Sequence, residues 1–166
     1  MKVSKTNALR ILDTLGTGYE AVALNIKEAV SGTEAARLLG VDPRFVYKTL
    51  VTIGKSGEHY VFVIPAAEEL DLKKAALAAG EKSVNMLPAK NLLPVTGYVH
   101  GGCSPIGMKK RFPTFIDSSA ENLDYIFVSG GRVGLQIKIS PIALKNTAEG
   151  RFVGVSSRDA SRDEAK

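Results

Sequence analysis

The residues best suited to chemistry lie in one stretch, GYVHGGCSPIGMKKRFPTFID, at positions 97–117. Gly101 and Gly102 stand side by side in it, and adjacent glycines allow positive φ and close approach of a ligand to the main chain. Two neighbouring N–H groups in such a turn can bind an anion or stabilise an oxyanion as an acyl bond breaks. An ordinary surface turn has the same composition, so the local pattern leaves both interpretations open.

Three cations, Lys109, Lys110 and Arg111, follow these glycines. They could hold a phosphate close to the turn, or they could form a solvated charged surface. Ser104 lies in the same stretch, but no histidine stands in a recognisable triad-like relation to it. The pattern therefore gives little support for Ser104 as a nucleophile.

Residues that could ligate a metal are few. The single cysteine, Cys103, excludes an internal disulfide and any multi-cysteine metal site, and a lone cysteine is usually inert packing. Only two histidines, His59 and His100, are present. We expect no metal site and no cofactor, although His100 stands next to the paired glycines and could contact a ligand.

Lys48 is the second candidate, in the middle of the segment FVYKTLVTI at 45–53. Both faces of this segment are largely apolar, as in a strand covered on both sides. An unpaired ammonium is costly to bury, so we expect Lys48 either at an exposed strand edge or in a pocket. In a pocket its amine could donate hydrogen bonds to a carbonyl or phosphate oxygen.

The third candidate is the glycine-rich turn Ser129-Gly130-Gly131, which by itself is typical of a β-hairpin. The strand after it alternates apolar and polar residues through 133–139. Further strands are predicted at 19–24, 45–53, 60–64, 83–87, 112–116 and 125–128. Helices are predicted at 8–15, 31–39, 72–79, as a short turn at 88–93, and from residue 141.

These elements predict an α+β protein of a single domain, with a mixed, strongly curved, barrel-like β-sheet and short helices packed around it. The chain has 166 residues and a formal net charge of +5, which suits contact with part of an RNA. No run of eighteen apolar residues and no signal pattern is present, so we expect a cytoplasmic protein without a membrane span. The polar segment from Ser156 onward is predicted to be loose.

Several of these motifs occur together in one known family. VYKTL at 46–50, GGCSPIGMKKRFPTFID at 101–117 and VSGG at 128–131 with GL at 134–135 resemble the YbaK/EbsC family of aminoacyl-tRNA editing domains. LDLKK at 70–74 and TGY at 96–98 also fit. The resemblance spans roughly residues 4–158, and we expect an editing domain over residues 1–158. The polar, charged composition predicts a flexible tail at 159–166.

Within the family, the chain looks most similar to free-standing deacylases of Cys-tRNA(Pro). The resemblance implies that the substrate's own thiol attacks its carbonyl, forms a cyclic thiolactone and releases the tRNA. It implies that Lys48 holds the acyl-adenosine end and that the Gly101 and Gly102 amides stabilise the carbonyl oxygen. Ser129 and Gly130 would line the same pocket together with Tyr19, Thr49 and Ser104, while Lys109, Lys110 and Arg111 would bind the acceptor end of the tRNA.

Two positions depart from the family pattern. Gln136 stands where the family often has Asp, and Cys103 occupies a place that is commonly aliphatic. Neither change removes the lysine or the paired glycines, but both bear on the choice of amino acid.

Three functions stay open at this point. The first is deacylation of Cys-tRNA(Pro), and also of Cys-tRNA(Cys), by a monomer that acts transiently with prolyl-tRNA synthetase. The second is editing of another small amino acid, such as Ala-tRNA(Pro), which has no internal nucleophile. The third is a tRNA- or nucleotide-binding module without turnover.

Overall fold

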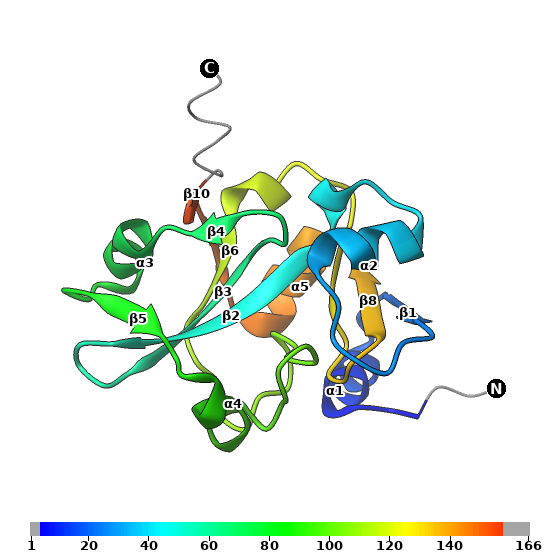
Figure 1. Ribbon diagram of the computed structural model, residues 1–166, viewed down its shortest axis with the longest axis horizontal. Helices are drawn as coiled ribbons and strands as arrows, with labels where there is room; N and C mark the ends of the chain where they lie inside the picture. Colours follow the sequence, from blue (N-terminus) through cyan, green and yellow to red (C-terminus); the bar gives the residue numbers. More distant parts are fainter. Residues whose placement is uncertain (1–3, 158–166) are drawn as a thin grey trace.

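The computed structural model describes residues 4–157, which form an open α+β arrangement of helices and sheets (Figure 1). The helices are α1 (Asn7–Leu15), α2 (Gly32–Leu39), α3 (Leu72–Ala79), α4 (Ala89–Thr96) and α5 (Pro141–Ala148), with 3₁₀ turns η1 (Pro43–Phe45) and η2 (Ser118–Ala120). The strands are β1 (Glu20–Ala23), β2 (Tyr47–Gly54), β3 (His59–Pro65), β4 (Glu69–Leu70), β5 (Val84–Met86), β6 (Thr114–Asp117), β7 (Ile126–Ser129), β8 (Leu135–Ile139), β9 (Arg151–Val153) and β10 (Ser156–Ser157). No helix in the described part of the chain has the length and apolar content needed to cross a membrane.

The strands form three separate sheets, so the expected barrel-like sheet is wrong. The largest sheet is mixed, in the order β5-β2-β3-β6-β9, with β6 parallel to both β3 and β9. The other two are antiparallel, in the orders β1-β8-β7 and β10-β4. An isolated parallel bridge pairs Val46, the residue before β2, with Phe127 of β7. The 3₁₀ turn η1 ends at Phe45, immediately before Val46.

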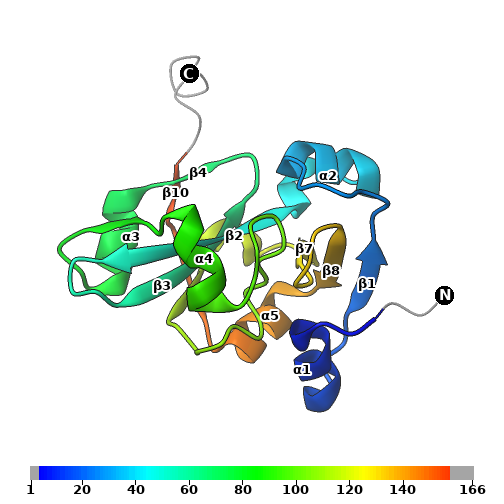
Figure 2. The same cartoon turned by 60° about the horizontal axis from the view of Figure 1, so that its bottom comes forward.

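The main core lies between the two larger sheets. Leu135, Ile137 and Ile139 alternate along β8 and are buried against α1, as the sequence pattern predicts. Helix α5 enters this core through Leu144, and in Figure 2 it lies beneath the junction of the two sheets. Helix α3 covers the other face of the largest sheet, where Ala75 and neighbouring residues pack on β3.

The helix boundaries follow the capping residues of the sequence. Ser31 Oγ accepts a hydrogen bond from the Glu34 N–H at 3.1 Å and starts α2, while Asp71 caps α3 in the same way. Gly16, Gly40 and Gly80 end their helices in the left-handed conformation. These predictions are confirmed because the interactions that set each boundary lie within a few residues of it.

The C-terminal part was predicted incorrectly. Ser156 and Ser157 form β10 and pair with β4, although the sequence suggested a loose segment. Asp117 fixes the conformation of this segment, because its Oδ1 accepts hydrogen bonds from the Val155 N–H at 2.9 Å and the Ser156 N–H at 3.0 Å. Strand β9 was also missed. The expected tail at 159–166 lies outside the described residues.

Candidate active site

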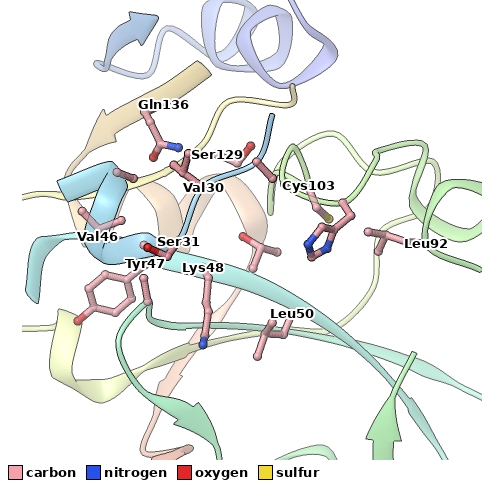
Figure 3. Close-up of a pocket in the computed structure, with 17 residues that line it drawn as sticks. Val30, Ser31, Val46, Tyr47, Lys48, Leu50, Leu92, Cys103, Ser129 and Gln136 are labelled. Atoms are coloured by element: carbon pink, nitrogen blue, oxygen red, sulfur yellow. The ribbon is translucent and has the colours of Figure 1, made fainter. Parts of the chain in front are cut away.

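A cavity of about 390 Å³ opens beside the N-terminal half of β2 (Figure 3). Its size falls within the range of small-molecule sites in proteins. Its walls come from the segment before α2, the start of α2, β2, α4, the loop after α4 and the facing ends of β7 and β8. The lining residues are Ala29, Val30, Ser31, Gly32, Ala35, Val46, Tyr47, Lys48, Thr49, Leu50, Ala66, Leu92, His100, Gly101, Cys103, Ser129 and Gln136.

The cavity follows a free edge of β2. One side of the strand pairs with β3 along its whole length, whereas in the described structure β5 covers the other side only at Thr52–Gly54. Side chains from both faces of β2 therefore border the cavity. Figure 3 shows Lys48 and Leu50 on one side of the β2 ribbon, with Ser129 and Gln136 on the other. Successive residues of a strand point to opposite faces, which places the Thr49 side chain opposite Lys48.

Lys48 satisfies both of the expectations raised for it, because the strand edge on which it lies also borders a pocket. The side chain is half-buried, opposite Ile64 in the β2–β3 register. Within residues 4–157 its ammonium has no hydrogen-bond or ion-pair partner. An unpaired cation in a partly apolar cavity can bind an anionic or carbonyl oxygen.

Gly101 and Gly102 allow two close approaches of the chain. Gly101 has a φ of 81°, and a Cβ at this position would overlap the Cβ of Ala29. A Cβ on Gly102 would lie 2.8 Å from the backbone of Arg132 in the β7–β8 turn. Glycine at both positions therefore lets three segments meet at the cavity.

The two glycine amides differ in their availability. The Gly102 N–H donates to the Val99 carbonyl at 3.0 Å, so this expected oxyanion donor is already used in a turn. The Gly101 N–H has no acceptor among residues 4–157, and Gly101 lines the cavity. Of the expected pair, the Gly101 amide is the one left free for a ligand.

The β7–β8 turn contributes Ser129 to the cavity and not Gly130. Ser129 Oγ accepts the Gly131 N–H at 3.2 Å, and its hydroxyl hydrogen remains free to donate. The Gly130 N–H donates to the Leu135 carbonyl at 2.7 Å, and the Gly130 carbonyl accepts from Thr6 Oγ1 at 2.6 Å. Gly130 thus serves the hairpin itself.

Two further expected residues lie away from the cavity. Ser104 is completely buried, and its hydroxyl accepts the Ile106 N–H at 3.2 Å within the loop. Tyr19 borders a separate shallow depression beside Lys138, where β1 begins, and its hydroxyl donates to Asp13 Oδ1 at 2.7 Å. Neither residue lines the wall to which it was assigned.

The three cations are exposed on the same loop but outside the main cavity. Lys110 and Arg111 border a second cavity of about 200 Å³. Arg111 forms an ion pair of 2.7 Å with Glu149, and Lys109 Nζ lies 3.5 Å from the Pro94 carbonyl oxygen. Residues 100, 101 and 103 line the first cavity and residues 105–108 the second, so one loop connects both.

Two weak acids in the cavity wall stay protonated at neutral pH. Burial raises the pKa of the Cys103 thiol to about 11. Burial also raises the pKa of the Tyr47 hydroxyl to about 12, and this hydroxyl lies 2.7 Å from Ser119 Oγ. Neither group is a ready nucleophile, because nucleophilic attack requires the deprotonated form.

Residues 27–147 match the family model described as "Aminoacyl-tRNA editing domain". The chain belongs to this family. The matched region contains every residue that lines the candidate cavity. The resemblance inferred from the sequence motifs is therefore confirmed.

The similarity to known relatives covers nearly the whole chain. The chain is 41% identical over 156 residues to a protein of Enterococcus faecalis named "Putative Cys-tRNA(Pro)/Cys-tRNA(Cys) deacylase EbsC", covering 93% of this chain and 95% of the relative. A solved structure described as "a putative trans-editing enzyme for prolyl tRNA synthetase" aligns with a TM-score of 0.82 at 23% identity, over 93% of this chain and 99% of the other. A second, described as "hypothetical protein APE2540", aligns with a TM-score of 0.85 at 24% identity, over 92% and 100%. The two structures establish a shared fold.

Several lining residues of the editing domain were not identified as site residues from the sequence. Ser31 was assigned only as a helix cap, and Val30, Ala66 and Leu92 carried no chemical signal at all. Gln136 was noted as a departure from the family pattern, and that was the one available pointer to it. Apolar wall residues of this kind are brought together by the fold and not by any local motif.

Proposed function

We propose that this protein is a trans-editing deacylase that removes cysteine from mischarged tRNA(Pro), and also from Cys-tRNA(Cys). The proposal rests on the cavity, which lies within the region that matches the editing-domain family. It presents a cation at Lys48, a free amide at Gly101 and the Ser129 hydroxyl. The similarity to the enterococcal relative, whose name specifies both cysteinyl substrates, supports the choice of amino acid.

The proposed reaction uses the nucleophile of the substrate. The cysteinyl thiol loses its proton and attacks its own ester carbonyl, so that a C–S bond forms. The C–O bond to the ribose breaks, the ribose oxygen takes up a proton, and the products are a cyclic thiolactone and free tRNA. The protonated Cys103 thiol and the Tyr47 hydroxyl do not compete as nucleophiles. Orienting an intramolecular attack is worth up to about 7–11 kcal/mol of the barrier.

The protein would then act by positioning and by electrostatics. Lys48 would bind carbonyl, ribose or phosphate oxygens at the acyl-adenosine end. The Gly101 amide would donate to the carbonyl oxygen as negative charge develops on it, and removal of one such donor typically reduces kcat by about 10²–10³-fold. Ser129 and Thr49 would contact the same end of the substrate. Gly102 would act through the shape of the loop, because its own N–H is bonded to Val99.

The exposed cations Lys109, Lys110 and Arg111 would bind phosphates of the tRNA acceptor end. They lie on the loop that also forms the cavity wall, so a tRNA whose 3′ end occupies the cavity would pass close to them. Binding of this type weakens steeply with added salt. Prolyl-tRNA synthetase would be the transient partner that supplies the mischarged tRNA.

The decisive experiment is deacylation of purified Cys-tRNA(Pro), Ala-tRNA(Pro) and Pro-tRNA(Pro) by the wild type and by Lys48→Ala. We expect rapid loss of cysteine only, and its near abolition in Lys48→Ala with an unchanged circular dichroism spectrum. Lys55→Ala, an exposed lysine in the hairpin that follows β2, is the matched control and should keep full activity. Loss of alanine would contradict the thiol mechanism, and tRNA binding without any hydrolysis would indicate a binding module instead.

A further inference from the structure

The loop between α4 and β6 is held in place through its carbonyl groups. The Ile106 carbonyl accepts from the Tyr98 hydroxyl at 2.6 Å, and the Gly107 carbonyl accepts from Asn7 Nδ2 at 2.7 Å. Gly107 has a φ of 83°, and a Cβ at this position would lie 2.8 Å from the Tyr98 hydroxyl oxygen. The loop is therefore packed closely against Tyr98 and the start of α1, and its conformation is set without a ligand.

Four backbone N–H groups of the same loop have no acceptor among residues 4–157. They belong to Gly107, Met108, Lys110 and Arg111, all of which border the second cavity. Lys110 is exposed and forms no ion pair within the described structure, whereas Arg111 is paired with Glu149. The rim of the second cavity thus offers N–H donors and a free positive charge, a combination that binds anions such as phosphate.

The interior of the second cavity is largely apolar. Its walls come from α1, the loop and the end of α5, and they include Ile11, Ile106, Met108, Phe112 and Ala148. The volume of about 200 Å³ lies below the range of complete small-molecule sites, so the cavity suits one ring system rather than a whole ligand. An apolar, partly aromatic cavity beside phosphate-binding donors matches the two parts of a nucleotide, its base and its phosphate.

We propose that the second cavity binds one unpaired nucleotide of the substrate tRNA. The base enters the apolar interior, and the phosphate accepts hydrogen bonds from the free loop amides and from Lys110. Only an unpaired nucleotide fits, because a base within a duplex stays stacked and paired. The choice of RNA as the ligand rests on the proposed function, but the deacylation chemistry itself makes no use of this cavity.

One loop joins the second cavity to the first. Cys103 borders the first cavity and Pro105 the second, and their Cα atoms can be at most about 7.6 Å apart. The terminal adenosine carries the amino acid into the first cavity, and a preceding nucleotide of the single-stranded 3′ end occupies the second. Binding one strand at two points raises its affinity above that of either contact alone.

The test follows the methionine methyl groups by NMR while the trinucleotide CCA, the single-stranded end of tRNA, is added. Met108 borders the second cavity, whereas Met86 lines neither cavity, and the signal that is lost in Met108→Leu is assigned to Met108. We expect CCA to shift the Met108 signal saturably and to leave the Met86 signal unchanged. Inorganic phosphate at the same concentration should shift the Met108 signal much less, because it carries no base.

Four variants locate the bound RNA. Ala148→Leu fills the second cavity and should abolish the shift of the Met108 signal, whereas Lys48→Ala alters only the first cavity and should preserve it. Lys110→Ala should weaken CCA binding and reduce the slope of log affinity against log salt by about 0.7, the value for one phosphate contact on a single strand. Lys73→Ala, on α3, is the matched control and should leave both quantities unchanged.

An unmoved Met108 signal would overturn the proposal, and so would an equal shift with inorganic phosphate, which would indicate an anion site without a base. A shift that persists in Ala148→Leu or disappears in Lys48→Ala would place the RNA in the first cavity alone. Equal behaviour of Lys110→Ala and Lys73→Ala would also contradict the assignment.

Deacylation of Cys-tRNA(Pro), measured separately, decides the proposed function. In an active enzyme, Ala148→Leu should raise KM severalfold at unchanged kcat, because the second cavity binds RNA and does not touch the reacting atoms. A wild type that binds CCA beside Met108 but releases no cysteine would keep the nucleotide site and remove the deacylase.

Discussion

Gly101 packs directly against Ala29, so closely that a Cβ on the glycine would overlap the Cβ of Ala29. This contact joins the loop after α4 to the segment before α2 and closes one wall of the cavity. The backbone of Gly101 also has positive φ, so a residue with a side chain at this position would be strained.

We therefore expect Gly101→Ala to lower kcat/KM for Cys-tRNA(Pro) by more than tenfold and the free energy of unfolding by about 1–3 kcal/mol. Gly57→Ala is the matched control, because Gly57 has positive φ but no atom within 4 Å of the added Cβ. It should lose stability without losing activity. Unchanged deacylation in Gly101→Ala would show that this wall does not need its present shape.

Asp117 holds the C-terminal segment in place through its hydrogen bonds to Val155, Ser156 and Ser119. Burial raises the pKa of this carboxyl, but the hydrogen bonds outweigh burial and leave the pKa below its ordinary value. A carboxyl whose pKa is lower in the folded state stabilises the protein above the unfolded-state pKa. That stabilisation is lost as the pH falls through the folded-state pKa.

We expect Asp117→Asn to reduce the free energy of unfolding at pH 7 by about 1–3 kcal/mol. The difference from the wild type should shrink as the pH falls below the unfolded-state pKa of about 3.9 and on through the lower folded-state pKa. Urea unfolding at pH 7, 5 and 3 measures it. A difference that stays constant over this range would mean that the charge of Asp117 contributes nothing.

Lys109 and Lys110 are both exposed, and Lys110 borders the second cavity. The double variant Lys109→Ala/Lys110→Ala should raise KM for Cys-tRNA(Pro) and flatten its dependence on salt, with kcat little changed. Lys73→Ala/Lys74→Ala removes the same charge from α3 and serves as the control, since α3 lies at the far end of the largest sheet (Figure 1). If both double variants behave alike, only the net charge matters and not the position of the cations.

Cys103 lies in the cavity wall with a raised pKa, so its thiol is protonated at neutral pH. Cys103→Ala should keep the deacylation rate of the wild type within about threefold, because the proposed nucleophile belongs to the substrate. In the native wild type, alkylation by iodoacetamide should be slow at pH 7.5 and accelerate as the pH approaches 11. Loss of turnover in Cys103→Ala, together with fast alkylation at neutral pH, would assign the nucleophile to the protein.

The elements of this fold that the sequence determined are those specified by nearby residues. The Ser31 cap, the glycine ends of α1, α2 and α3, and the alternation along β8 all depend on neighbours a few positions away. Lys48 could be identified from the sequence for the same reason, because a lysine in an apolar strand demands a free edge or a pocket. The family motifs extended this local information to part of the cavity, on β2, the loop after α4 and the end of β7.

Tertiary structure alone decided which of these groups remain available. Three contacts join residues far apart in the chain: Gly102 with the β7–β8 turn, Tyr19 with the depression beside Lys138, and β10 with β4. Local patterns encode the conformation of a segment, whereas long-range packing determines which hydrogen-bonding groups are used within the fold and which face a ligand.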